Sequence, residues 1–566
     1  MDRYPTWPNL AAMMFDRARA WVNKPMLRAW RDGRWHSTTW GEFAVLAAAC
    51  ARGLRAAGVS AGDRVLICAE NRPEYPIAEI ALMAIRAVPV PAYVTNTPED
   101  HAHLLRDSGA RVAIVSTPAL ADRVRAGAAS CGGLDLLVVM DAPREAEPPV
   151  VAWSALVANL RAPDDIIAEA ATIPRTAMAC LIYTSGTGGA PRGVMLPHRC
   201  ILSNCEGAFD LVRPLRLKDE IYLSYLPLAH AYEHTVGQFF LLSIGSEIVY
   251  ARGVEHLAAD MLSVRPTVLS AVPRVLDVIR GRILGHVGRE KPWRQRLFHA
   301  ALRIGERKLD GEKLSWLERL ADPLLDRLVR AKIRARFGGR LVAAISGGAR
   351  LEPDIGRFFL AMGLTIMQGY GQTEAGPVIS ATRPDDIRID TVGPPLRGVD
   401  LRLADDGEIL VRGDLVMDGY WGRPADTAAT IVDGWLHTGD IGELDDGNLR
   451  ITDRKRDMIV LSGGENVSPA KVEGRLVAEP EIAQAVVAGD GWSGLTALVV
   501  PAEGAAEESV AHAIARANKH LSVTERIRKH AIVSPFTVEN GLLTPSHKVR
   551  RLLVIRANHQ TLAALH

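Results

Sequence analysis

Cysteine is scarce and unpatterned in this chain of 566 residues. The six cysteines form neither a CxxC pair nor the spacing of a metal site: Cys50, Cys68, Cys131, Cys180, Cys200 and Cys205. The sequence therefore indicates no disulfide framework and no zinc cluster, and we expect buried thiols in a reducing compartment.

Long hydrophobic runs and strong net charge are also absent. No run approaches the about 18 apolar residues of a membrane-spanning helix. The first nine residues contain Asp2 and two prolines, with no apolar core of a secretory signal after them. The formal net charge of +2 gives no argument for nucleic acid. We expect a cytoplasmic protein without a nucleic-acid partner, and a peripheral contact with the inner face of a membrane stays open.

Short apolar runs alternate with segments of helical periodicity. Arg64 to Cys68 is predicted as a strand, Glu74 to Ala87 and Pro98 to Ser108 as helices, and Val112 to Ser116 as a strand. Such alternation predicts parallel sheets covered by helices, which is an α/β fold. The length exceeds what one hydrophobic core usually supports, so several subdomains are expected.

The chain becomes strand-rich in its last third, at Gly407 to Gly413 and at Leu449 to Thr452. The charged pentad Asp453 to Asp457 comes next, and a new α/β pattern starts after it. We therefore predict one domain over residues 1–455 and a second over 456–566.

A loop of small residues, hydroxyls and one cation follows the predicted strand Met178 to Ile182. It reads Tyr183-Thr-Ser-Gly-Thr-Gly-Gly-Ala-Pro-Arg-Gly193. Glycines let backbone N–H groups approach a ligand, and hydroxyls and Arg192 add donors, a composition that suits phosphate oxygens. The loop lacks the ending of a Walker A motif and the third glycine of a dinucleotide fingerprint. A flexible surface loop is the alternative, disfavoured by the length and uniform chemistry.

An aromatic ring, a hydroxyl and a carboxylate lie close together after the predicted strand Leu364 to Met367. Tyr370 can stack on a base, Thr373 can donate to a phosphate, and Glu374 can hold Mg²⁺, which favours oxygen ligands. A polar turn around a buried tyrosine would not explain all three. The small-residue turn Ser346 to Ala349 follows another predicted strand.

Two further polar candidates follow predicted strands. His230 stands where an imidazole could reach a pocket mouth, although a lone histidine is more often a core or cap residue. Asp440 ends the loop that begins at Asp433 and can accept both hydroxyls of a ribose.

The segment from Gly281 to Arg340 is basic, with 16 Lys and Arg against 7 Asp and Glu, a net charge of +9. Apolar residues interleave with the cations at roughly helical intervals: Trp293, Leu297, Phe298, Leu302 and Ile304. A basic amphipathic helix can lie on an anionic membrane surface. The alternative, which is the more common case, is a solvated charged face packed on the main domain.

With these motifs in this order, from about Trp40 to Arg551, the chain resembles the AMP-forming acyl-CoA synthetases of the adenylate-forming ligase superfamily. Leu226-Pro-Leu-Ala-His230 and Asp433-Gly-Trp-Leu-His-Thr-Gly-Asp440 are most similar to the long-chain fatty acid branch. The resemblance implies a large N-terminal domain of stacked α/β sheets with a β-rich subdomain, and a small, mobile α+β C-terminal domain.

The resemblance also implies a two-step reaction that uses ATP, Mg²⁺ and coenzyme A. A fatty acid carboxylate attacks the α-phosphate of ATP, which releases pyrophosphate, and the thiolate of coenzyme A then displaces AMP. A ligase for an aryl or shorter carboxylate, or one that loads a carrier protein, is the alternative. A catalytically silent binding protein would be expected to lack Glu374, Asp440 or Lys548, and all three are present. Acyl-chain length and oligomeric state stay open.

Motif by motif, the resemblance assigns roles to single residues. Contacts with ATP are implied for Thr184, Ser185, Gly186, Thr187, Gly188, Gly189, Arg192, Gly348, Ala349, Gln368, Gly369, Tyr370, Asp440 and Arg454. Catalytic roles are implied for His230, Thr373, Glu374 and Lys548, and Mg²⁺ contacts for Thr184 and Glu374. Arg456 matches the hinge, and Gly463 and Gly464 match the backbone that lines the thiol tunnel.

Two residues depart from the family pattern. Family loops commonly read Thr-Thr-Gly and end with Lys, whereas Gly188 and Arg192 stand here. Glycine keeps the backbone N–H and arginine keeps the positive charge, so we expect weaker binding of pyrophosphate and retained activity.

Overall fold

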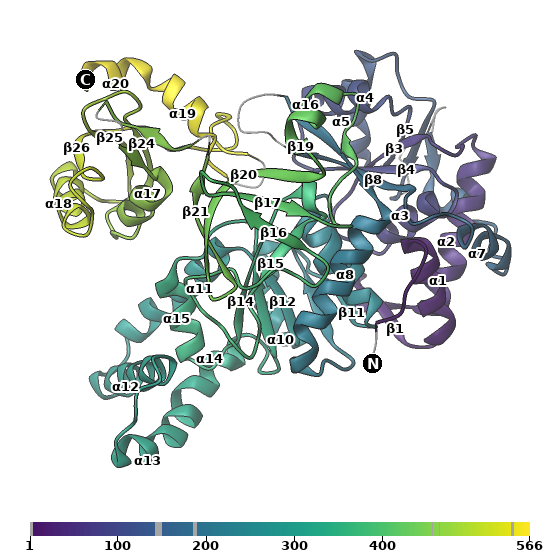
Figure 1. Ribbon diagram of the computed structural model, residues 1–566. Coiled ribbons are helices and arrows are strands. Elements are labelled where there is room, and N and C mark those ends of the chain that lie inside the picture. Colours follow the sequence, from purple (N-terminus) through teal and green to yellow (C-terminus); the bar gives the residue numbers. More distant parts are fainter. Residues whose placement is uncertain are drawn as a thin grey trace. The chain divides into compact units, whose positions relative to one another are not determined.

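The computed structural model describes residues 4–141, 150–184, 190–455, 457–462, 465–544 and 548–565. The chain divides into two compact units (Figure 1). The first comprises Met1–Tyr183, Gly193–Asp400 and Val411–Leu436, and the second comprises Thr184–Arg192, Leu401–Leu410 and His437–His566. Each unit is made of several segments of the chain, so the division does not test a single boundary. The predicted boundary between residues 455 and 456 therefore stays a prediction.

An eight-stranded sheet forms the centre of the first unit, in the order β15-β14-β13-β12-β10-β11-β1-β2. Its strands from β14 to β1 are parallel, and β15 and β2 pair antiparallel at the two edges. The bounds are β1 Pro25–Arg31, β2 Arg34–Thr39, β10 Ile221–Ser224, β11 Glu247–Tyr250, β12 Val268–Ala271, β13 Ala343–Ser346, β14 Ile366–Gly371 and β15 Val378–Ala381. This sheet and its helices confirm the predicted α/β class.

A second, wholly parallel sheet in the first unit has the order β4-β3-β5-β6-β7. Its strands are β3 Arg64–Cys68, β4 Val88–Ala92, β5 Val112–Val115, β6 Leu136–Val139 and β7 Val150–Ala152. Prolines cannot donate to a sheet ladder, and the strand that contains Pro89 and Pro91 accordingly lies at the edge. The predicted strands and helices of this region are confirmed, although the helix from Glu74 ends at Ala84.

Side-chain caps mark the starts of three of the four helices in this region, α2, α4 and α5. The helices here are α2 Trp40–Ala56, α3 Glu74–Ala84, α4 Pro98–Ser108 and α5 Pro118–Ala129. Thr39 and Glu42 form a reciprocal capping box at α2, and Thr97 and Asp100 form one at α4. Gly109 ends α4 in the left-handed region, at φ 69°, which is a glycine-favoured helix stop.

Two shorter sheets contain the strands next to the candidate loops. One has the order β18-β9-β8, with β8 Met178–Thr184, β9 Arg192–Pro197 and β18 Gly419–Tyr420. Another has the order β16-β17-β20-β19, and β21 pairs with β20. Its bounds are β16 Asp400–Leu403, β17 Glu408–Arg412, β19 Ile431–Val432, β20 Trp435–Asp445 and β21 Asn448–Arg454, which confirms the predicted strand-rich region.

The basic segment is helical. The helices are α11 Pro273–Gly288, α12 Pro292–Leu309, α13 Trp316–Leu325, the π-helical turn η4 Asp326–Arg330, α14 Ala331–Arg336 and α15 Pro353–Ala361. α12 packs on α15 and carries α13 on another side, so it lies between them (Figure 1). A buried core of the first unit includes Phe298 of α12 and Phe358 and Phe359 of α15.

The C-terminal part of the second unit is a small α+β structure. Its main sheet has the order β24-β25-β26, and β22 pairs with β23. The bounds are β22 Ile459–Val460, β23 Asn466–Val467, α17 Pro469–Val477, β24 Ile482–Ala488, β25 Leu495–Pro501, α18 Glu507–Asn518, β26 Ile527–Ile532, α19 Arg551–Ala557 and α20 His559–Leu565. Among the described residues, no helix combines the length and the apolar character that crossing a bilayer requires.

Candidate active site

Three predicted site segments of the first unit begin at one edge of the eight-stranded sheet. β10, β13 and β14 belong to the parallel part of that sheet, so their carboxyl ends point the same way. The segment containing His230 follows β10, the turn containing Gly348 follows β13, and Thr373 and Glu374 follow β14. Ligands of open α/β sheets bind at such an edge.

Tyr232 joins the first two of these segments. Its hydroxyl donates to the carbonyl of Ile345 at 2.9 Å. A Cβ added to Gly347 would lie 3.0 Å from the ring of Tyr232, so the turn packs tightly against the ring. His230 Nδ1 accepts the backbone N–H of Tyr232 at 3.2 Å. This contact favours, for a neutral ring, the tautomer with its proton on Nε2.

Glu374 is buried, with an exposed fraction of 9%. It lies in the short 3₁₀ helix Thr373–Ala375, and its Oε1 accepts a hydrogen bond of 2.7 Å from the hydroxyl of Tyr420. Asn204 holds the backbone beside it, donating to the carbonyl of Ala375 and accepting from the N–H of Val378. The carboxylate is thus oriented by neighbours on two other elements.

The remaining predicted residues of this edge differ in what they can offer. Tyr370 lies in β14 opposite Ser380 of β15, and it is half-buried. Gly348 and Ala349 are exposed, and Gly348 has φ +80° with open space around it. Gln368 is buried, and its Nε2 donates to the carbonyl of Ile389 at 2.6 Å. Its side chain therefore holds the segment that contains Ile389. Gly369 and Thr373 are half-buried.

Sequence reasoning missed a second buried carboxyl near His230. Glu233 is fully buried at the start of the π-helix η2 Glu233–Phe240, where Tyr222 and Ser224 each donate a hydroxyl to it at 2.6 Å. Burial raises the pKa of Glu233 to about 7, although both hydrogen bonds lower it. An acid next to an otherwise apolar stretch was the signal in the sequence, and π-helical turns are frequent at functional sites.

The start of the phosphate-type loop is anchored. Tyr183 donates its hydroxyl to Asp107 Oδ2 at 2.8 Å, and Arg423 pairs with Asp107 Oδ1 at 3.1 Å. Burial and Asp107 together raise the pKa of Tyr183, so it stays a donor. The predicted residues Ser185, Gly186, Thr187, Gly188 and Gly189 lie outside the described residues.

The second unit brings together three predicted residues that are far apart in the sequence. Asp440 and Arg454 are register partners in β20 and β21, with Arg454 Nε 3.4 Å from Asp440 Oδ1. The charges of both act on Lys548. The side chain of Lys548 is exposed, yet surrounding protein lowers the pKa of its ammonium; Arg454 lowers it further, and Asp440 raises it.

Thr544 holds the backbone of Lys548. Its N–H donates to Thr544 Oγ1 at 3.0 Å, and its carbonyl accepts from the N–H of Thr544 at 2.8 Å. Thr184 ends β8 and Arg192 begins β9 in the same unit, and both are half-buried. The predicted hinge Arg456 and the predicted tunnel residues Gly463 and Gly464 lie outside the described residues.

Glu408, which sequence reasoning did not single out, supports the Asp440 loop. Its Oε1 accepts the N–H of Gly439 at 2.9 Å, and its Oε2 lies 2.9 Å from Lys455 Nζ and 3.1 Å from His437 Nδ1. Burial raises the pKa of this carboxyl, but hydrogen bonds from Lys455, His437 and Gly439 outweigh burial and hold it below the usual value.

A magnesium ion would fit Glu374. Within the part of the chain that the structure describes, no three His, Cys, Asp or Glu side chains converge as a protein-only metal site. Mg²⁺ is commonly bound through one or two carboxylates together with substrate phosphates, so a single oriented carboxylate such as Glu374 suits it.

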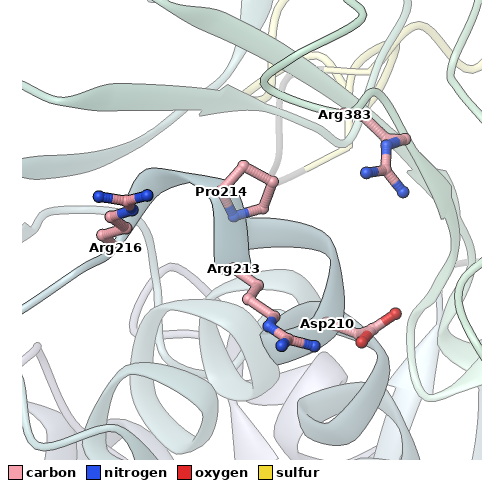
Figure 2. Close-up of a pocket in the computed structure, with 5 residues that line it drawn as sticks. All are labelled: Asp210, Arg213, Pro214, Arg216 and Arg383. Atoms are coloured by element: carbon pink, nitrogen blue, oxygen red, sulfur yellow. The ribbon is translucent and has the colours of Figure 1, made fainter. Parts of the chain in front are cut away.

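A hollow in the first unit lies apart from these assignments. It is lined by Asp210, Arg213, Pro214, Arg216 and Arg383 (Figure 2). None of the predicted site residues lines it, so it gives those predictions no support.

Comparison with known proteins gives matches over nearly the whole chain. The model of the AMP-binding enzyme family matches residues 14–421, and that of the AMP-binding enzyme C-terminal domain matches residues 456–565. The long-chain-fatty-acid–CoA ligase FadD15 of Mycobacterium bovis is 34% identical over 96% of this chain and 95% of its own length. The peroxisomal long chain acyl-CoA synthetase 6 of Arabidopsis thaliana is 30% identical over 92% of this chain and 80% of its own.

Solved structures share the fold at lower sequence identity. The anthranilate CoA ligase AuaEII, in complex with anthranoyl-AMP, matches with a TM-score of 0.76 and 21% identity over 99% of both chains. ATP-bound MatB from Rhodopseudomonas palustris matches with a TM-score of 0.72 and 23% identity over 98% of this chain and 99% of its own. These similarities establish a large N-terminal and a smaller C-terminal domain of the same fold.

Proposed function

We propose, since the chain belongs to the AMP-binding enzyme family, that it joins a long-chain fatty acid to coenzyme A at the expense of ATP. A carboxylate oxygen forms a bond to the α-phosphorus and pyrophosphate leaves. The thiolate of coenzyme A then bonds to the acyl carbon, and AMP leaves with the oxygen. Relatives named as long-chain ligases, at 34% and 30% identity over nearly the whole chain, support this choice of substrate.

One structural observation carries the proposal: Asp440 and Arg454 are paired, and the charges of both act on Lys548, although about a hundred residues separate Asp440 from Lys548. A carboxylate that can accept ribose hydroxyls thus lies beside two cations that can meet phosphate and carboxylate oxygens. Bringing an anionic acid to a polyanion requires such neutralisation and positioning.

In the first unit, the proposed roles follow from side-chain chemistry. Tyr370 stacks on the adenine, and Thr373 donates to the α-phosphate. His230 lies beside the acyl carboxylate and donates from Nε2, because its Nδ1 is held as an acceptor by Tyr232. Gly348 presents no side chain, so the backbone can border the base and acyl channel.

Magnesium is the cation we assign to Glu374. When bound, it supplies positive charge to the phosphate oxygens. Tyr420 holds one oxygen of the carboxylate by a hydrogen bond, which restricts its rotation before the ion arrives. The contributions of Thr184, Arg456, Gly463 and Gly464, and the mobility of residues 456–566, stay predictions from the family resemblance.

The deciding experiment is ATP–pyrophosphate exchange across a panel of acids, with thioester formation measured in parallel. Exchange that rises with chain length, and acyl-CoA formed when coenzyme A is added, is the expected result. A preference for aryl or short-chain acids would mean that the substrate is one of these acids and not a long-chain fatty acid. Exchange without any acyl-CoA would favour loading of a carrier protein, and no exchange with any acid would end the proposal.

We also propose a peripheral location on the inner face of a membrane, with the basic segment 281–340 as the contacting region. Its net charge of +9 supports this location, since anionic lipid surfaces attract clustered Lys and Arg.

A further inference from the structure

The outward side of α13 is apolar. Trp316, Leu317, Leu320 and Leu324 have exposed fractions of 69, 59, 70 and 58%, and Leu328 of η4 continues the stripe at 40%. These positions recur at helical spacing and lie on one side of the helix, which we call the α13 face. A surface helix usually turns its apolar side inward and its charges outward, so α13 has the opposite arrangement.

The inward side of α13 explains the reversal, because it is held by charges. Glu318 pairs with Arg307 of α12 at 2.6 Å, and Asp322 pairs with Arg330 at 2.7 Å and with Lys308 of α12. Leu325 packs on Ala301 and Ile304 of α12. Ion pairs and a small apolar contact therefore fix the helix with the α13 face turned to solvent.

α12 is itself a rigid support. A Cβ at Gly305 would lie 2.2 Å from the carbonyl oxygen of Ala361, so α12 and α15 pack backbone to backbone at this point. Phe298 and Ile304 of α12 are buried, at 4 and 2% exposure. The apolar residues that the sequence suggested for membrane contact therefore face inward, Trp293 excepted, and the exposed apolar surface lies one helix further along.

The charges around the α13 face indicate what kind of surface it can bind. Six of the seven acidic residues of 281–340 are paired with bases. Among the described residues, these cations have no acidic partner within 4.0 Å: Arg282, Arg289, Lys291, Arg296, Arg303, Lys313, Arg319, Arg327, Lys332, Arg336 and Arg340. By helical spacing Arg327 lies on the α13 face, and Arg319 lies on the same helix, to one side of that face.

We propose that the α13 face docks on an anionic lipid bilayer. The apolar side chains would enter the boundary between headgroups and acyl chains, and the surrounding cations would meet lipid phosphates. A second copy of this chain would instead bring two segments of +9 together and suffer like-charge repulsion. Long-chain fatty acids partition into bilayers, so this surface would place the enzyme at its substrate, a benefit that rests on the proposed function.

The test is flotation of the full chain with vesicles of phosphatidylcholine, alone or mixed with phosphatidylglycerol, without ATP or fatty acid. Wild type should float with the mixed vesicles at low salt and much less at high salt, since the Debye length falls from about 10 Å at 0.1 M to about 3 Å at 1 M. The triple variant Trp316→Ser, Leu320→Ser, Leu324→Ser should lose roughly tenfold or more of the binding. Arg319→Glu with Arg327→Glu should weaken it as well.

A matched control removes equally exposed apolar side chains elsewhere: Leu160→Ser, Val254→Ser and Leu262→Ser, at 61, 71 and 58% exposure. It should float like wild type. The proposal is overturned if the α13 variant floats like wild type or if wild type ignores anionic vesicles. It is also overturned if the variant changes only the oligomeric state, which would assign the face to a second copy. Because the assay contains no substrate, its outcome is independent of whether the enzyme activates fatty acids.

Discussion

The Glu374 group of the first unit and the Lys548 group of the second are held by different forces. Glu374 is nearly inaccessible, and its partner Tyr420 is neutral. Lys548 and Arg454 are exposed, and their neighbour is the charged Asp440. Burial shields the hydrogen bond to Glu374 from salt, whereas the exposed charges around Lys548 are screened.

This difference suggests a division of tasks. A buried carboxylate with a neutral donor keeps its orientation without a counter-charge. This arrangement suits Glu374, which we propose to bind Mg²⁺. An exposed lysine beside an arginine and an aspartate gains a defined environment only through charge balance. Replacements in the two groups should therefore fail in different ways.

The largest effect is expected for Lys548→Ala. Loss of the ammonium should lower adenylation on the order of 10²- to 10³-fold, because a charge on the reacting phosphate and carboxylate oxygens is no longer compensated. Thioester formation from supplied acyl-adenylate should be spared. The two half-reactions are measured separately by pyrophosphate exchange and by acyl-CoA release.

Lys471→Ala is the control for this change, since Lys471 is an exposed lysine of the same unit that pairs with Glu525. It should leave both half-reactions intact. Equal losses in the two half-reactions of Lys548→Ala would remove the role we give this lysine.

The second effect concerns stability in the first unit. Burial raises the pKa of Glu233 from 4.5 to about 7, so the folded protein holds a proton that the unfolded chain releases. The stabilisation by that proton is complete below pH 4.5 and is lost as the pH rises to about 7, by as much as about 3 kcal/mol. Glu233→Gln should flatten this part of the pH profile in urea unfolding. A variant with the wild-type slope would show that Glu233 titrates normally.

A smaller effect, roughly tenfold, is expected for Tyr420→Phe. Without the hydroxyl, Glu374 loses the donor that orients it, so more Mg²⁺ should be needed for half-maximal exchange. Tyr222→Phe is the matched control, because Tyr222 donates to a different buried carboxyl, Glu233. It should change stability and leave the Mg²⁺ requirement alone. If both variants shift the Mg²⁺ requirement equally, the Tyr420 contact has no specific role.

Alternation of strands and helices predicted the α/β class and the strand bounds near Arg64 and Val112, because buried apolar runs and capping residues are local signals. It also placed His230, Gly348 and Glu374 after strands. Whether those strands were neighbours could not be deduced, since sheet order depends on contacts far apart in sequence.

Local sequence patterns could not predict which residues form hydrogen bonds with the predicted site residues. Tyr420 lies 46 residues from Glu374, and Glu408 lies 31 from Gly439, so neither pair leaves a periodic trace. The basic segment shows the same limit. Its composition suggested a surface helix, but ion pairs between α12 and α13 decided which apolar side chains face outward.

The smallest effect is expected for Glu408→Gln, in the second unit. The amide can still accept the N–H of Gly439, but it loses the charge that attracts Lys455 and His437. The loop that presents Asp440 should loosen, and the KM for ATP should rise roughly threefold with little change in kcat, because only ground-state positioning is affected. High salt should raise the KM of wild type in the same direction and that of the variant less, since the variant has already lost the screened interaction. A variant with unchanged KM and unchanged salt response would mean that Glu408 stabilises the fold only, and that the ion pairs of this unit do not position Asp440, the carboxylate to which we assign the ribose.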